Sequence, residues 1–104
     1  MFTFIETSSF ERTLSGYLSD DEYAALQQFL VFNPEAGNIV PSSGGVRKLR
    51  WGVEGRGKRG GVRIIYYVRF VPNQFWMLAV YSKSKQENAP AHILKQLKKA
   101  FENE

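Results

Sequence analysis

Three strand-like runs with short links between them occupy the middle of this 104-residue chain and constrain its fold most strongly. They cover residues 46–51, 61–70 and 75–81, and the second is dense in the β-branched and aromatic residues that favour strands. A glycine-rich loop joins the first two runs, and Pro72-Asn73 turns the chain between the second and the third. Consecutive strands with short connections usually pair with one another, so we predict an antiparallel meander.

Two helices are predicted before the meander. Residues 2–6 read as a short strand, and the hydroxyl residues at 7–9 can cap a first helix that loosens near Gly16. Residues 19–22, Ser-Asp-Asp-Glu, form a capping-box pattern that begins a second helix, which should end before Pro34. The apolar positions of the second helix follow a 3.6-residue period. They are Tyr23, Leu26, Phe29, Leu30 and Phe32.

A last helix is predicted from about residue 89 to residue 102. The order strand, helix, helix, three strands, helix predicts one α+β domain over residues 1–104. We expect a small antiparallel β-sheet with the two N-terminal helices packed on one face, together with the C-terminal helix. Side chains of residues 61–70 should alternate between the two faces of the sheet. The face with Arg63, Ile65, Tyr67 and Arg69 is predicted to be the working surface.

The charge of the chain is strongly polarised. Residues 1–40 carry one basic and six acidic residues, a net charge of −5, whereas residues 41–104 carry thirteen basic and four acidic residues, a net charge of +9. Eight of the fourteen basic residues lie within residues 47–69, beside the only acid of that stretch, Glu54. Guanidinium groups bind phosphate oxygens in a fork, so this stretch predicts a nucleic acid partner.

The residue content excludes several common chemistries. The chain has no cysteine, so it has neither disulfides nor thiolate sites. The single histidine, His92, starts the last predicted helix, where we expect a surface or capping residue, and any Ser-His-Asp triad would need it at its centre. The acids do not cluster in metal-ligand spacing. The loop is not a phosphate-binding Walker motif, because it lacks the final Lys-Ser or Lys-Thr. We therefore expect no cofactor and no metal.

Lysine, arginine and tyrosine remain, and such a set can cleave RNA. The RNA supplies its own nucleophile, the 2′-hydroxyl group, and crowded cations stabilise the charge that develops on the phosphate. Cations in a cluster also lower the pKa of a neighbouring lysine, which can then accept a proton. Tyrosines beside the cluster can stack on an unpaired base, and Tyr67 is a better candidate than Tyr66, which should face the core.

The chain resembles the RelE/HigB superfamily of bacterial type II toxins, and most closely its HigB-like branch. The resemblance rests on the segments GGVRKLRW, GRGKRGGVRIIYYV and MLAVYSKSK, and it covers nearly the whole chain in element order. It implies a ribosome-dependent mRNA endonuclease that inhibits translation without a metal ion. It also implies two partners: the ribosome with its mRNA, and a cognate antitoxin, expected to be a DNA-binding protein of the HigA type.

The resemblance also assigns roles to individual residues. Arg63 matches a phosphate-binding arginine, Lys48 a basic residue tied to proton abstraction or charge stabilisation, and Lys83 a residue that assists the leaving group. Tyr81 is a fourth catalytic candidate. The remaining basic and aromatic residues around the loop and the strands are predicted to bind RNA. They are Arg47, Arg50, Arg56, Lys58, Arg59, Tyr67, Arg69 and Lys85.

Two other functions remain open from the sequence: a gyrase-inhibiting toxin of the ParE type, and a nucleic-acid-binding protein without catalysis. A gyrase-directed relative would not need Lys48, Arg63 and Lys83 to converge in the fold, so their separation distinguishes these functions. The N-terminal segment MFTFIETSSFER lacks the pattern of a signal peptide, and no apolar run is long enough to span a membrane. We therefore expect a cytoplasmic protein with no membrane partner.

Overall fold

A computed structural model describes residues 2–52, 61–82, 95, 98 and 99 of the chain. The elements follow the predicted order as far as Ser82, with one additional two-residue strand at Asn38–Ile39. They are β1 (Thr3–Glu6), α1 (Ser8–Leu14), α2 (Asp20–Phe32), β2 (Asn38–Ile39), β3 (Arg47–Trp51), β4 (Val62–Phe70) and β5 (Asn73–Ser82). Lys95, Lys98 and Lys99 are helical, and the rest of the predicted C-terminal helix lies outside the described residues.

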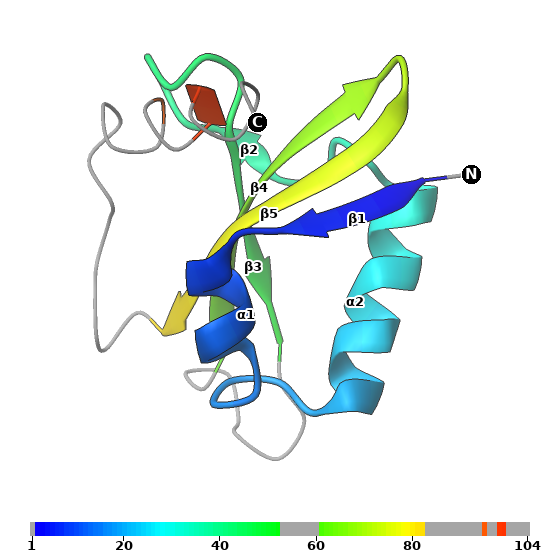
Figure 1. Ribbon diagram of the computed structural model, residues 1–104, viewed down its shortest axis with the longest axis vertical. Helices are drawn as coiled ribbons and strands as arrows, with labels where there is room; N and C mark the ends of the chain where they lie inside the picture. The colour runs from blue at the N-terminus through cyan, green and yellow to red at the C-terminus, as the bar shows by residue number, and fades with distance from the viewer. Residues whose placement is uncertain (1, 53–60, 83–94, 96–97, 100–104) are drawn as a thin grey trace.

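The strands form one sheet in the order β1-β5-β4-β3-β2 (Figure 1). Strands β3, β4 and β5 pair antiparallel in sequence order, which confirms the predicted meander, and β2 pairs antiparallel with β3. Strand β1 pairs parallel to β5, so the sheet is mixed and the prediction of a wholly antiparallel sheet was wrong. Phe4 stacks on Phe75 with 4.9 Å between ring centroids, and the Thr7 N–H donates to the Met77 carbonyl at 3.1 Å. These contacts join distant parts of the chain, and no local pattern in residues 2–6 specifies them.

Both N-terminal helices pack on one face of the sheet, and the α+β class is confirmed. Thr7 caps α1 by accepting the Phe10 N–H, and Ser19 and Glu22 form both hydrogen bonds of the predicted capping box at the start of α2. Helix α2 runs alongside the sheet (Figure 1). The core between the helices and the sheet consists of Phe10, Leu18, Leu26, Leu30, Val62, Ile64, Tyr66, Val68, Phe75, Met77 and Val80.

Phe32 is not part of this core, contrary to the prediction. Its side chain is 77% exposed, whereas that of Leu30 is fully buried. Residues two positions apart on an α-helix are separated by about 200° around the helix axis, so Leu30 and Phe32 cannot share one face. No helix in the described part of the chain is long and apolar enough to cross a membrane.

The opposite face of the sheet also carries an apolar cluster, which the sequence did not indicate. Ile65 pairs with Ala79 and Tyr66 pairs with Met77, so Leu78 is an extra residue that bulges from β5. The bulge places Leu78 in the second cluster with Ile65. The Leu78 carbonyl accepts a hydrogen bond from the Thr7 hydroxyl at 3.0 Å. The cluster consists of Val46, Ile65, Trp76, Leu78 and Tyr81. Only part of the predicted working face therefore presents cations.

Candidate nucleic-acid interface

Three chemically active side chains form a row across the sheet. Arg50 on β3 pairs with Arg63 on β4, and Arg63 pairs with Tyr81 on β5. Residues paired across strands point to the same face, with Cβ atoms about 5 Å apart. The row therefore spans about 10 Å on the face opposite the helices, since neighbouring strands lie about 4.8 Å apart.

The two arginines of this row face each other directly across β3 and β4. Like charges directly opposite each other in a sheet are destabilising. Arg50 is exposed and Arg63 is half-buried. An anion placed between them would relieve the repulsion and accept hydrogen bonds from both forks.

Lys48 extends the row along β3. It pairs with Ile65, two residues from the Arg50–Arg63 pair, and its side chain therefore lies on the same face about 6.6 Å along the strand. Lys48 is half-buried. The structure thus brings Lys48, Arg50, Arg63 and Tyr81 together at one place on the sheet, and we call these four residues the cationic row.

Tyr81 is the most enclosed member of the cationic row. Its side chain is 6% exposed, and its hydroxyl group is buried without a hydrogen-bond partner among the described residues. Burial raises the pKa of the Tyr81 hydroxyl, and the positive charge of Arg63 offsets part of that rise. The phenol is therefore neutral at neutral pH and keeps a proton that it can donate.

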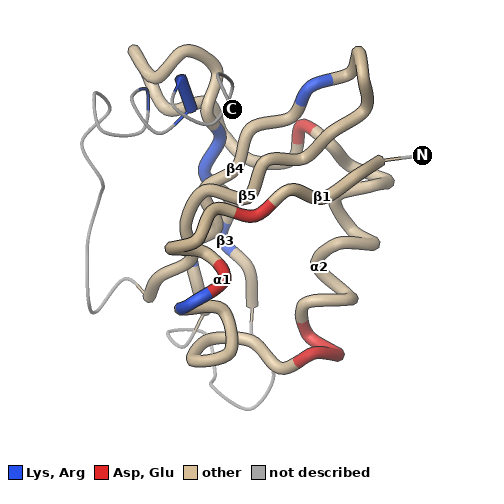
Figure 2. The backbone as a smooth tube through the Cα atoms, viewed as in Figure 1, with Lys and Arg blue, Asp and Glu red and all other residues tan. Residues whose placement is uncertain are grey.

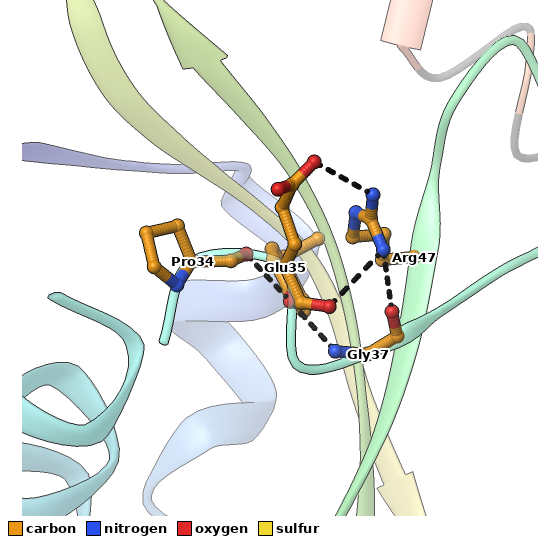
Figure 3. A network of polar contacts seen from close by, with 5 residues as sticks. Pro34, Glu35, Gly37 and Arg47 are labelled. Carbon is orange, nitrogen blue, oxygen red and sulfur yellow. Dashed lines mark hydrogen bonds and ion pairs between the residues drawn. The ribbon is translucent and has the colours of Figure 1, made fainter. Parts of the chain in front are cut away.

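Arg47 lies on the other face of the sheet, away from the cationic row. It pairs with Tyr66, whose side chain belongs to the helix-facing core, and its guanidinium donates to the Gly37 carbonyl at 2.7 Å (Figure 3). A second set of contacts joins it to Glu35. The Arg47 side chain is thus engaged within the chain, and its predicted RNA contact stays a prediction. The two-residue period of β3, in which Arg47 shares a face with Leu49 and Trp51, is the sequence signal for this orientation.

Tyr67 and Arg69 point to the same face as Arg63 but lie farther along β4. The Nζ atom of Lys98 lies 4.3 Å from the centre of the Tyr67 ring, and the Arg69 guanidinium lies 5.1 Å from that of Trp76. The Tyr67 and Trp76 rings meet edge to face at 5.7 Å. Cations thus cover both rings, and the sequence did not indicate that Lys98 would lie over Tyr67.

The remaining predicted site residues lie outside the described part of the chain. They are Arg56, Lys58, Arg59, Lys83 and Lys85. The acids at the start of α2 lie apart from the basic residues of β3, as Figure 2 shows. In the residues that the structure describes, no three His, Cys, Asp or Glu side chains come together to hold a metal ion.

The fold and the cationic row define a small α+β domain with a basic sheet face. Among solved structures, the chain is similar to that of a double arginine-to-alanine mutant of the E. coli toxin RelE in the free state, with a TM-score of 0.53 and 17% identity. The match covers 89% of this chain and 92% of the other. No protein-family model matches the chain. The likeness confirms the predicted RelE-like fold, and assignment to the HigB-like branch stays a prediction.

Proposed function

We propose that this protein is the toxin of a type II toxin–antitoxin system and cleaves mRNA on the ribosome. The observation that carries the proposal is the cationic row, in which two facing arginines, a lysine and a buried phenol share one face of a RelE-like sheet. Such a cluster of donors is suited to a phosphate group whose charge increases during cleavage.

The chemistry requires three tasks of the protein. The 2′-hydroxyl of the RNA loses a proton and attacks the adjacent phosphorus, and the bond to the 5′-oxygen breaks as that oxygen gains a proton. We assign the phosphate to Arg63 and Arg50, which can form bidentate contacts with its oxygens. Lys48 lies near enough to act at the 2′-hydroxyl or to stabilise charge, and Lys83 is proposed to assist the departing 5′-oxygen. The products are a cyclic phosphate and a free 5′-hydroxyl.

The proposed partners follow from the same surface. The ribosome would present mRNA in an extended form to the cationic row. An antitoxin would neutralise the toxin, and an acidic contact region in it would speed association with the basic face. We expect this antitoxin to be a DNA-binding protein of the HigA type.

The direct test is cleavage in a reconstituted translation system. The purified protein should cut an mRNA that is being translated and leave fragments with the new ends described above, which primer extension would map. The same preparation should leave gyrase supercoiling of plasmid DNA unaffected. Inhibited supercoiling with intact mRNA would overturn the proposal and favour a toxin of the ParE type.

Replacing Tyr81 by phenylalanine should separate stability from activity. The substitution removes a buried hydroxyl that has no partner among the described residues, so the free energy of unfolding should be unchanged or rise by about 1 kcal/mol. Cleavage should fall by roughly tenfold or more, because a hydrogen-bond donor for the reacting phosphate is lost. Denaturant unfolding and single-turnover cleavage measure the two effects, and full activity in the variant would remove Tyr81 from the site.

A further inference from the structure

Arg47 and Tyr66 lie on the helix-facing side of the sheet, opposite the cationic row, and hold residues 34–37 through polar contacts that we call the polar clamp. Figure 3 shows these contacts. The Arg47 guanidinium donates to the Gly37 carbonyl at 2.7 Å and to the Glu35 carbonyl at 3.2 Å, and it meets the Glu35 carboxylate at 3.2 Å. Its cross-strand neighbour Tyr66 donates to the Pro34 carbonyl at 2.9 Å and accepts the Gly37 N–H at 3.0 Å. Residues 34–37 are thus held by two adjacent strands at once.

The clamp holds the segment that leads directly into β2. Strand β2 has only two residues, and its Asn38 pairs with Lys48 of the cationic row. Gly37 packs so closely against β3 that a Cβ atom there would lie 3.0 Å from both the Lys48 carbonyl oxygen and the Tyr66 ring. The outer side of β3 therefore depends on the clamp for much of its support, since two ladder residues alone restrain it weakly.

The position of β3 sets the geometry of the cationic row. Lys48 and Arg50 lie on β3, whereas Arg63 lies on β4. A shift of β3 relative to β4 would change the separation of the two arginines, and a misplacement of about 1 Å can cost roughly a hundredfold in rate. We infer that Arg47 is a positioning residue: with Tyr66 it clamps residues 34–37 against β3 and so holds Lys48 and Arg50 in register with Arg63.

The backbone contacts of Arg47 carry more weight in this clamp than its ion pair. Glu35 is 64% exposed, and an ion pair with an exposed partner contributes little to stability. Arg47 is only 15% exposed, and its planar fork makes three contacts at once: Nη1 donates to both carbonyl groups, and Nη2 donates to the Glu35 carboxylate. A lysine keeps the charge but has no such fork. Burial also raises the pKa of Tyr66, so its phenol stays neutral and can donate and accept at the same time.

The test rests on the proposed function and uses substitutions that keep the charge of the chain. Arg47→Lys keeps the cation and loses the fork, and Gly37→Ala changes no charge but forces residues 34–37 away from β3. Both variants should lower the kcat of mRNA cleavage by about tenfold to a hundredfold and leave KM and its salt dependence unchanged. Arg12→Lys, on the exposed surface of α1, is the matched control and should behave as wild type.

The opposite outcome identifies Arg47 as an RNA contact. In that case Gly37→Ala would be fully active, and Arg47→Ala would reduce the salt dependence of ribosome binding by about one phosphate contact. Glu35→Gln would then tighten binding, because it releases the guanidinium. Any of these results would overturn the positioning role.

Amide hydrogen exchange provides a readout that needs no cleavage. In Arg47→Lys, exchange should accelerate in β2 and β3 and stay unchanged in β4 and β5. Unchanged exchange in β3 would overturn the inference, as would faster exchange with a wild-type kcat. If the wild-type protein cleaves no mRNA, the proposed function fails, and the exchange data still decide whether the clamp holds β3.

Discussion

Replacing Arg63 by alanine should reduce mRNA cleavage by a hundredfold or more while the protein remains folded. Arg63 lies within the cationic row, between Arg50 on β3 and Tyr81 on β5. Loss of a donor that stabilises transition-state charge typically costs about 3–4 kcal/mol. Its removal also relieves the repulsion with Arg50, so the free energy of unfolding should change by less than about 1 kcal/mol. Single-turnover cleavage and denaturant unfolding measure the two quantities.

Two matched variants make this result specific to the site. Arg12→Ala removes the same side chain from the exposed surface of α1 and should retain full activity. Arg63→Lys keeps the charge without the fork, and we expect an intermediate rate because a lysine makes fewer hydrogen bonds to one phosphate. If Arg63→Ala arrests translation as efficiently as wild type, the cationic row is not the catalytic site.

Cleavage should also require the ribosome and should survive chelation of divalent metal ions. Lysine and arginine side chains are in general almost wholly protonated at neutral pH, so they form a weak acid–base system. Tyr81 does not change this, because burial raises the pKa of its hydroxyl. Positioning of the RNA must then supply much of the rate, and an mRNA held in an extended form on the ribosome meets that need.

The measurement compares three substrates at equal RNA concentration. They are the naked mRNA, the same mRNA in a programmed ribosome, and the programmed ribosome treated with a transition-metal chelator at constant magnesium. Keeping the magnesium constant preserves the ribosome, so any loss of cleavage reports on a metal ion bound to the protein. Rapid cutting of the naked mRNA would contradict ribosome dependence, and complete inhibition by the chelator would contradict a metal-independent reaction.

Local patterns predicted most of the framework correctly, because short-range interactions determine those features. The capping box at Ser19 and Glu22 and the end of α2 before Pro34 depend on neighbours within a few residues. The alternation along β4 follows from the two-residue period of a strand, and the short links between β3, β4 and β5 leave antiparallel pairing as the simple arrangement. The prediction that Phe32 lies on the buried face of α2 was wrong, because the helix period separates Phe32 from Leu30 by about 200° around the axis.

The candidate site was only partly predictable. Strand period alone places Lys48 and Arg50 on one face and Arg47 on the other, whereas the density of charge in this stretch does not distinguish them. Whether Arg50 faces Arg63 depends on the register between β3 and β4, which no local pattern specifies. The Tyr81 hydroxyl is buried and has no hydrogen-bond partner in the described part of the chain, which is a property of its surroundings and not of its sequence neighbours.

The sequence by itself determined the two N-terminal helices, the strands of the meander, the α+β class and the concentration of cations in one half of the chain. The tertiary structure decided the parallel pairing of β1, the bulge at Leu78 and the second apolar cluster, because each depends on contacts between segments far apart in the chain. It also decided which cations meet. Pairing across three strands gathers Arg50, Arg63 and Tyr81 into one row, whereas the carbonyls of residues 34–37 hold Arg47 on the opposite face.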